Sequence, residues 1–248
     1  MNPPILFDAL RKSDLFGGRV TPKQVQGING VLAGFAKVGD GRPKTLAYGL
    51  ATVRRECGAD MLPVREGFAK SDAAARAYVK RQGYRYAEVV GGQCFYGRGF
   101  VQLTWAANYK ASSEDAGVDL LANPDAALDP DIAGRLLFLG LQDGRWNGSE
   151  HRGIAFYLPD AGPDDLKGAR RTVNGTDHWQ DIAGYYRTFL AAIQAAGGAD
   201  AARDVQMDLT DAEAAALQGL MRWKAKTPPP EDFAAYERVV GWLKEMPA

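Results

Sequence analysis

The sequence predicts a mainly helical fold with few, short strands. Apolar residues recur at three- and four-residue spacing through most of the chain, helix-start and helix-stop signals bound those segments, and runs with strand-like alternation are scarce. The chain has 248 residues, which is enough for one large domain or for a domain with a small appendage.

Each helix follows from local signals. Thr21 and Ser71 stand where N-caps belong, and Gly58 is a stop signal. The expected helices run from Pro22 to the loop at 39–43, through Leu46 to Glu56, from Ser71 to Gly83, from about Leu103 to Ala116, from Pro130 through Leu141, and from Trp179 to Ala196. Between them, residues 84–99 are expected to form an irregular loop or a short hairpin, residues 144–168 a loop with short elements at most, and Asn174-Gly175 a turn.

The chain is expected to divide near residue 196. Gly197-Gly198 and the polar residues after it are typical of a linker. Thr210 and Glu213 then form a capping box, and two amphipathic helical patterns follow, separated by three prolines. We therefore predict a main domain over residues 1–196 and a helical extension over residues 197–248 that packs on it.

Charge and hydropathy argue against several classes of protein. Lys and Arg total 30, and so do Asp and Glu, so no net field favours nucleic acid. No segment approaches the roughly 20 apolar residues that span a bilayer, and the N-terminus lacks the pattern of a signal peptide. We expect a cytoplasmic product that is monomeric and does not insert into a membrane. Cys57 and Cys94 are too few for a disulfide framework; two buried, reduced thiols are favoured over a pair.

Residues 96–109 are the most informative segment. Gly97 and Gly99 flank Arg98, so the backbone there can turn sharply or be approached closely. Arg98 fits either a ligand contact or, as we favour, a buried partner of carboxylates. Gln102, Thr104 and Asn108 follow among apolar residues. This pattern suits the wall of a cleft that binds an uncharged, hydroxyl-rich ligand.

Two upstream glutamates are candidates for acid–base chemistry. Glu56 ends a predicted helix, and Glu66 follows a short extended run. Cleavage of a glycosidic bond needs one carboxylic acid and one carboxylate, and the acid works best when its environment disfavours ionisation. Arg54 and Arg55 beside Glu56 would work against that requirement. Spacing alone also allows both glutamates to be ordinary surface residues, and it leaves three rival carboxylates, Asp60, Asp72 and Glu88.

Metal, nucleotide and serine-nucleophile chemistries have weaker support. His151 and His178 are too far apart for a metal-binding helix motif, and a surface or capping role is favoured for each. The sequence has neither a phosphate-binding glycine loop nor the Gly-x-Ser-x-Gly elbow. We therefore predict no cofactor and no metal.

A family resemblance strengthens the hypothesis of sugar chemistry. Tyr96-Gly97-Arg98-Gly99, followed by Gln102-Leu103-Thr104 and Asn108-Tyr109, resembles the core motif of glycoside hydrolase family 19, which holds chitinases and phage-type endolysins. The segments that end in Glu56 and Glu66 and the late segment around Asn174 are similar to the family as well. The resemblance covers roughly residues 5–195. It implies a two-lobed, lysozyme-like fold with a central cleft.

The resemblance also assigns roles. It implies that Glu56 is the general acid, that Glu66 is the general base about 6.5–9.5 Å away, and that Thr104 helps to hold the attacking water of an inverting reaction. The remaining candidates, listed as substrate-binding residues, are Tyr96, Arg98, Gln102, Asn108, Tyr109 and Asn174. The chain departs from the family at the acid, because Arg55 and Cys57 flank Glu56 where the family has His-Glu-Thr.

Within the family, the endolysin branch is favoured. That hypothesis makes the substrate the glycan strands of peptidoglycan, reached after release by a separate pore-forming protein. A chitinase is the nearest alternative, and a cell-wall-binding protein that has lost turnover is the alternative outside enzymes.

Overall fold

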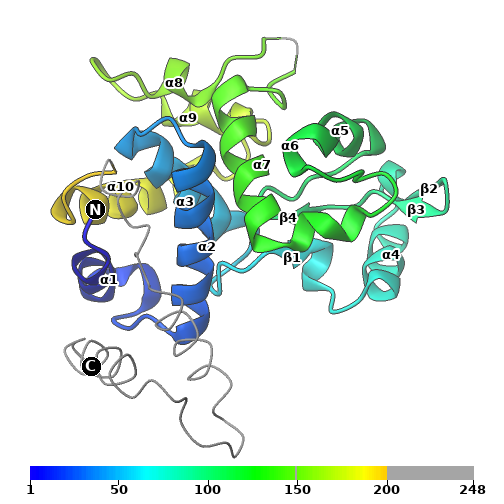
Figure 1. Ribbon diagram of the computed structural model, residues 1–248, viewed down its shortest axis with the longest axis horizontal. Coiled ribbons are helices and arrows are strands. Elements are labelled where there is room, and N and C mark those ends of the chain that lie inside the picture. Colours follow the sequence, from blue (N-terminus) through cyan, green and yellow to red (C-terminus); the bar gives the residue numbers. More distant parts are fainter. Residues whose placement is uncertain (149, 200–248) are drawn as a thin grey trace, which may run out of the picture. The chain divides into compact units, whose positions relative to one another are not determined.

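The computed structural model describes residues 1–148 and 150–199. Within them, helices dominate (Figure 1). The helices are α1 (Pro3–Lys12), α2 (Pro22–Val38), α3 (Pro43–Glu56), α4 (Asp72–Arg81), α5 (Ala106–Ala111), α6 (Ser113–Ala116), α7 (Pro130–Asp143), α8 (Ile154–Tyr157), α9 (Leu166–Ala169) and α10 (Trp179–Ala195). Short 3-10 helices lie at Asp14–Phe16, Glu66–Phe68, Arg85–Ala87, Pro124–Leu128 and Arg170–Thr172. The mainly helical fold predicted from the sequence is confirmed.

The four strands of the described residues are two residues long each and form two antiparallel pairs. Strand β1 (Val64–Arg65) pairs with β4 (Arg98–Gly99), and β2 (Val89–Val90) pairs with β3 (Gln93–Cys94). The second pair is the short hairpin expected within residues 84–99. The first pair has more consequence for the site, because it joins the segment that carries Glu66 to the Tyr-Gly-Arg-Gly segment.

The main hydrophobic core surrounds helix α3. Every residue of α3 from Thr45 to Val53 is buried. Helix α10 packs along α3, α1 packs on α10, and α7 packs on α2, so these five helices form the larger part of the described chain (Figure 1). A smaller apolar cluster of Ala75, Val79, Cys94 and Tyr96 lies under α4 and the hairpin. The described chain thus has a larger and a smaller part.

Most predicted boundaries agree with the structure, and two differ. Thr21 forms a full capping box with Gln24 at the start of α2, and Ser71 caps α4. The helix expected over 103–116 begins only at Ala106, because Gln102 and Trp105 adopt positive φ angles before it, and it breaks at Ser112. These angles cannot occur inside a helix.

Helix α1 was not predicted, although its start signals are present. The Asn2 side chain accepts a hydrogen bond from the Ile5 backbone N–H, and Pro3 and Pro4 occupy the first helical turn, where no N–H is needed. The Asn2 backbone N–H also donates to the Ala196 carbonyl at 2.7 Å. The start of the helix is therefore tied to the end of α10.

Both cysteines are free and buried, as expected. Among the described residues, no helix is long and apolar enough to span a bilayer. The predicted helices after residue 208 lie outside the described residues, so the division near residue 196 and the docking of the extension stay predictions.

Helices α2 and α7 cross at a glycine pair. A Cβ on Gly34 would lie 2.5 Å from the Gly134 Cα, so the two backbones approach more closely than any side chain permits. A Cβ on Gly30, one turn earlier on α2, would meet only Phe100 and Pro130 side-chain atoms at an ordinary 3.5 Å.

This difference predicts opposite effects for two substitutions of the same kind. Gly34→Ala forces α2 and α7 apart and should lower the free energy of unfolding by roughly 1–3 kcal/mol. Gly30→Ala should leave that free energy unchanged or raise it by up to about 1 kcal/mol, because alanine is the better helix former. Urea unfolding of both variants measures the difference; equal stability of the two would contradict the close crossing.

Candidate functional site

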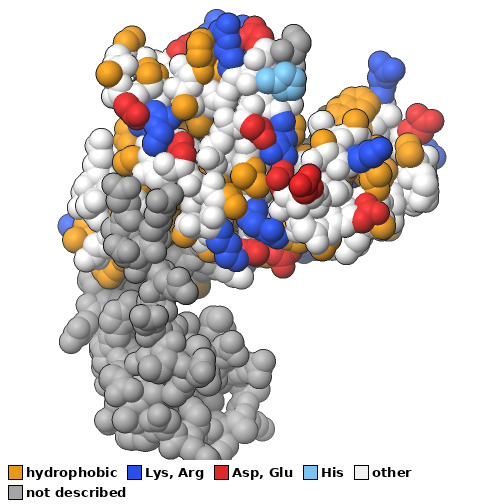
Figure 2. Space-filling view, turned by 45° about the horizontal axis from the view of Figure 1, so that its top comes forward, with side chains coloured by type: hydrophobic (Ala, Val, Ile, Leu, Met, Phe, Trp, Pro, Cys, Tyr) orange, Lys and Arg blue, Asp and Glu red, His pale blue; other side chains and the backbone are white. Residues whose placement is uncertain are grey.

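One cavity brings together six of the nine predicted site residues. Its volume is about 610 Å³, within the range typical of small-molecule sites. Figure 2 shows the visible face hollowed between the larger and the smaller part of the described chain. The predicted residues that line the cavity are Glu56, Glu66, Gln102, Thr104, Asn108 and Asn174. Tyr86, Trp105, Arg145, Trp146 and Val173 line it as well.

Glu56 enters the cavity from the C-terminal end of α3. Because the preceding turns of α3 are fully buried, the position of this end is fixed by core packing. The Glu56 carboxylate forms an ion pair with the Arg170 guanidinium at 2.8 Å, and the Arg170 side chain is only 2% exposed. Arg170 is itself held by a hydrogen bond from its Nε to the Asp177 carbonyl. Sequence reasoning missed Arg170, since it lies in a short 3-10 helix without a motif.

The residues beside Glu56 point elsewhere. Arg54 lies over the Tyr185 ring, 5.1 Å from its centroid, and Arg55 faces Asp181 at 3.9 Å. Cys57 is buried, with its Sγ 3.4 Å from the Gly99 carbonyl, and burial raises the pKa of its thiol. Arg55 and Cys57, the two residues at which the chain departs from the family pattern, therefore do not line the cavity.

Glu66 enters the cavity from the smaller part, immediately after β1. Its Oε2 accepts a hydrogen bond from the Gly97 backbone N–H at 2.8 Å, and its Oε1 accepts one from the Tyr86 hydroxyl at 2.6 Å. Burial, followed by the hydrogen bond to Glu66, raises the pKa of Tyr86, so this hydroxyl stays protonated and remains a donor. Both carboxylate oxygens are thus oriented by groups that can only donate to them.

The loop before α5 carries the neutral polar groups. Gln102 and Trp105 have positive φ angles of 53° and 75°, which non-glycine residues rarely adopt. The Thr104 hydroxyl donates to the Gln102 carbonyl at 2.7 Å, and the Asn108 amide donates to the Thr104 carbonyl at 2.8 Å. The Gln102 amide donates to the carbonyls of Val64 and Gly99. Such a combination of strain and internal bonding is common at functional sites.

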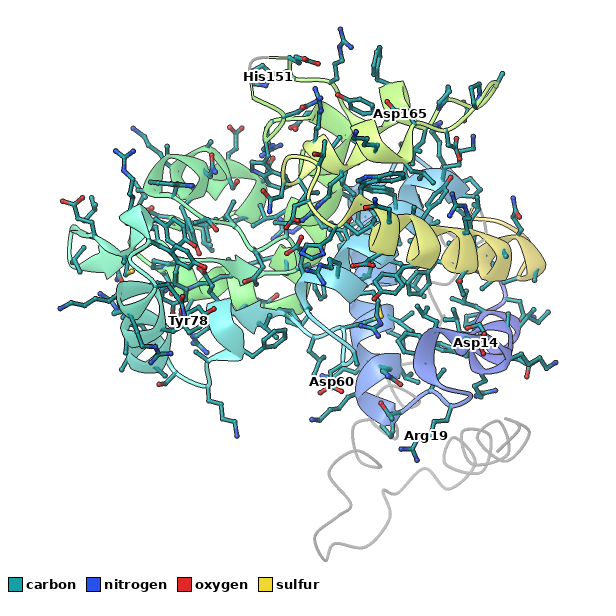
Figure 3. All side chains as sticks on the ribbon, turned by 180° about the vertical axis from the view of Figure 1, so that it is seen from behind. Asp14, Arg19, Asp60, Tyr78, His151 and Asp165 are labelled. Carbon is teal, nitrogen blue, oxygen red and sulfur yellow. The ribbon has the colours of Figure 1, made fainter. Side chains whose placement is uncertain are left out.

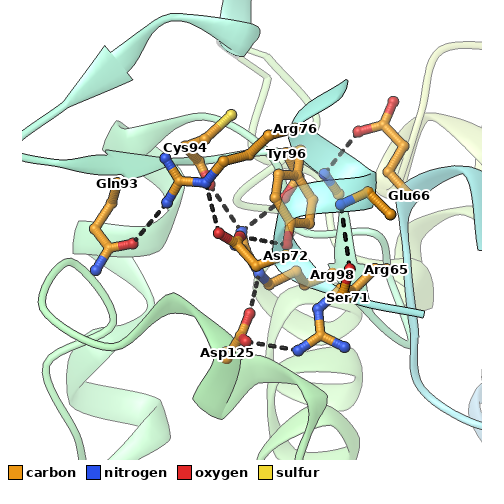
Figure 4. A network of polar contacts seen from close by, with 12 residues as sticks. Arg65, Glu66, Ser71, Asp72, Arg76, Gln93, Cys94, Tyr96, Arg98 and Asp125 are labelled. Carbon is orange, nitrogen blue, oxygen red and sulfur yellow. Dashed lines mark hydrogen bonds and ion pairs between the residues drawn. The ribbon is translucent and has the colours of Figure 1, made fainter. Parts of the chain in front are cut away.

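Three predicted substrate-binding residues lie outside the cavity lining, and their placement corrects that assignment. Tyr96, Arg98 and Tyr109 are each at most 1% exposed. Figure 4 shows Arg98 between two carboxylates: its Nη2 lies 3.1 Å from Asp72 and its Nε 2.8 Å from Asp125. These residues support the site from within. For Arg98, the alternative favoured from the sequence, a buried partner of carboxylates, is the one observed.

Protein groups pair with every nitrogen of the buried Arg98 guanidinium. The Arg98 guanidinium also donates to the Cys94 carbonyl at 3.0 Å and to the Tyr109 hydroxyl at 3.1 Å. It stacks 3.6 Å from the centroid of the Tyr96 ring. A buried charge persists only when it is paired and hydrogen-bonded in this way. Burial opposes ionisation of Asp72, but hydrogen bonds from Tyr96 and Arg76, with the charge of Arg98, lower its pKa overall.

The rival carboxylates do not line the cavity. Asp72 belongs to the Arg98 network (Figure 4). Asp60, labelled in Figure 3, pairs with Lys23 at 3.2 Å. Glu88 is exposed.

Neither histidine lines the cavity. His178 precedes α10 and lies near Asp177 and Asp181, in agreement with a surface or capping role. No group of three or more metal-ligating side chains occurs among residues 1–148 and 150–199.

The network predicts that Arg98 is needed for stability. Arg98→Met should lower the free energy of unfolding by roughly 2–4 kcal/mol, because it removes the buried cation that joins Asp72 and Asp125 and leaves each with only one partly exposed arginine. Arg76→Met removes a partly exposed partner of the same Asp72 and should cost about 0.5 kcal/mol. Chemical unfolding of both variants measures the contrast, and a small loss in Arg98→Met would show that the network is not needed for the fold.

Comparisons with known proteins bear on the identity of the site. The family model described as class I chitinase, for glycoside hydrolase family 19, matches residues 31–139. This segment carries Glu56, Glu66, Gln102, Thr104 and Asn108. No curated protein matches the chain at a significant level.

Solved structures of chitinases are similar to this chain. Chitinase C from Streptomyces griseus HUT6037 is 23% identical, with a TM-score of 0.45, over 79% of this chain and 78% of that chain. A bacterial family 19 chitinase is also 23% identical, with a TM-score of 0.44, over 80% of this chain and 95% of that chain. The match over residues 31–139 agrees with the resemblance of the core motif: this segment, which carries both glutamates, matches glycoside hydrolase family 19.

Proposed function

We propose that this glycoside hydrolase is an endolysin that cuts β-1,4 glycosidic bonds in the glycan strands of peptidoglycan by an inverting, two-carboxylate mechanism. The observation that carries the mechanism is the cavity itself. Glu56 enters it from the larger part of the described chain and Glu66 from the smaller part, with Thr104 in the same lining. Two carboxylates on separate elements can address opposite sides of one sugar ring, as inversion requires.

Glu56 acts as the general acid. It protonates the oxygen of the leaving sugar as the glycosidic bond breaks. Its position on a buried helix end and its contact with Arg170 fix the direction of the carboxyl group. When the leaving sugar departs with the proton, Arg170 stabilises the carboxylate that remains, because the two charges lie 2.8 Å apart in a shielded place.

Glu66 acts as the general base and Thr104 positions the water. The Thr104 hydroxyl uses its single proton to bond the Gln102 carbonyl, which leaves its oxygen as an acceptor. A water that donates one hydrogen to Glu66 and the other to Thr104 has its lone pair directed at the anomeric carbon. Transfer of the first hydrogen to Glu66 then accompanies the attack, and the product has inverted configuration.

Neutral groups in the lining suit an N-acetylated sugar. The side-chain amides of Gln102 and Asn108 donate to the protein's own carbonyls, and an amide oxygen can accept from the hydroxyl or N–H groups of a sugar. Asn174 and the neighbouring Val173 line the cavity as well. Trp105 and Trp146 add apolar surface for the carbon skeleton of the ring.

The central test is turnover of cell wall. The purified protein should clear a peptidoglycan suspension, and Glu56→Gln should slow clearing at least about a hundredfold while the variant remains folded, because the transferable proton is lost. Loss of the ion pair with the buried Arg170 should lower its thermal stability as well. Wild-type protein that binds the wall without reducing turbidity would instead support a binding protein without turnover. Mass spectrometry of the released fragments identifies the reducing-end sugar, and so the bond that is cut.

A chitinase is the second candidate, because the family model that matches residues 31–139 is described by that activity. Release of chitin oligomers together with intact peptidoglycan would favour this candidate over the endolysin. The monomeric state, synthesis in the cytoplasm and release through a separate pore-forming protein stay predictions.

The hydrogen bond from Tyr86 to Glu66 allows a separate test of Glu66 as the general base. Tyr86→Phe removes the donor to Oε1 but keeps the ring, so kcat should fall about tenfold, in keeping with the loss of one charge-assisted hydrogen bond. Tyr157→Phe, which removes a buried hydroxyl bonded to Asn147 outside the lining, is the control. Equal kcat values for Tyr86→Phe and the wild type would argue against Glu66 as the base.

A further inference from the structure

A row of three aromatic rings leads out of the cavity. The Tyr86 ring contacts both the Trp105 ring, with centroids 5.3 Å apart, and the Tyr84 ring, at 5.1 Å. Tyr86 and Trp105 line the cavity, whereas Tyr84 does not. Tyr84 is 40% exposed and Trp105 is 47% exposed. The row therefore extends an apolar surface from the site to the outside of the smaller part.

Hydrogen bonds hold the side chain of Tyr86 and the backbone that carries the other two rings. The Tyr86 side chain is held by the hydrogen bond that its hydroxyl donates to Glu66. The Tyr84 backbone N–H donates to the Val79 carbonyl at the end of α4, and its carbonyl accepts from the Ala87 N–H. The Trp105 backbone N–H donates to the Phe95 carbonyl. A fixed aromatic ring loses little conformational entropy when a ligand covers it.

This surface matches the chemistry of a sugar ring. One face of a pyranose presents mainly C–H groups, which pack on an aromatic ring, while the hydroxyl groups at its edge stay in water. The Tyr84 and Tyr86 rings are inclined by 31° to each other, whereas Tyr86 and Trp105 meet at 78°. Tyr84, which is exposed and lies outside the cavity lining, is therefore accessible to a sugar ring beyond the cavity rim.

Other exposed aromatic side chains of the described residues lack this continuity. Phe156 is 58% exposed, but it packs against Tyr157 and Arg152 lies 4.2 Å over its ring. Phe68 is 61% exposed and faces Gly58. Neither lines the cavity or contacts a residue of the aromatic row. Single exposed aromatic residues need no functional explanation, whereas a row continuous with a site does.

We propose that Tyr84 binds a sugar ring of the glycan strand outside the cavity, as an additional contact for long substrates. The proposal rests on the proposed function only in that the cavity takes a β-1,4 glycan; it holds for peptidoglycan and chitin alike. The protein should therefore bind longer strands more tightly, because only a strand that continues past the cavity rim reaches Tyr84.

The experiment measures affinity against oligosaccharide length, apart from cleavage. Glu56→Gln protein is titrated with two series of two to eight rings, one of N-acetylglucosamine alone and one of alternating N-acetylmuramic acid and N-acetylglucosamine. Tyr84→Ala, Tyr84→Phe and Phe156→Ala are each introduced into the same background. The thermal unfolding of every variant is recorded.

The expected result is that affinity rises with length in at least one series, and that Tyr84→Ala reduces it for the longest oligomer about fivefold more than for the shortest that binds. Tyr84→Phe keeps the ring and should retain the gain, as should Phe156→Ala. An unchanged length dependence in Tyr84→Ala, an equal loss at all lengths, an equal loss in Phe156→Ala, or no rise with length in either series would overturn the proposal. Failure of the proposed function has a different readout, which is intact peptidoglycan after treatment with the wild-type protein.

Discussion

The buried guanidinium of Arg98 is the interaction on which the rest of the site depends. Its side chain binds two carboxylates from separate elements, Asp72 at the start of α4 and Asp125 in the 3-10 helix before α7. Its backbone pairs with Arg65 of β1 on one side and with Leu103 on the other. One residue therefore connects the segment that carries Glu66 with the loop that carries Thr104.

This arrangement explains why a strained loop persists at the site. Positive φ angles at Gln102 and Trp105 carry a cost of about 1–3 kcal/mol each. The cost is offset by hydrogen bonds that only this path of the chain makes, among them Leu103 N–H to the Arg98 carbonyl at 2.8 Å. The strained turns direct Thr104 and Trp105 to the cavity instead of continuing as a helix.

The two glutamates are held by different physical means. Glu56 depends on core packing, because α3 is buried along most of its length and ends at the cavity. Glu66 depends on hydrogen bonds to Gly97 and Tyr86, within the smaller part. A carboxylate beside a single buried cation and a carboxylate between two neutral donors have unlike surroundings, so the two groups are not interchangeable.

Much of the fold was predictable because its signals are local. The caps at Thr21 and Ser71, the stop at Gly58 and the apolar spacing of α2, α3, α7 and α10 depend on neighbours within a few residues. The glutamates and the polar groups of residues 102–108 were also found from the sequence, through residue type and the family motif. Helix α1 was missed even though Asn2, Pro3 and Pro4 give a local start signal.

The sequence by itself determined which helices form and which side chains are chemically able to act. Only the tertiary structure decided which of those side chains reach the cavity. It buried Tyr96, Arg98 and Tyr109 beneath the site, turned Arg54 and Arg55 away from Glu56, and placed Arg170 against it. The physical reason is that a helix cap or a hydrophobic period is set by residues within one or two turns, whereas burial and ion pairing depend on segments that meet only when the whole chain packs.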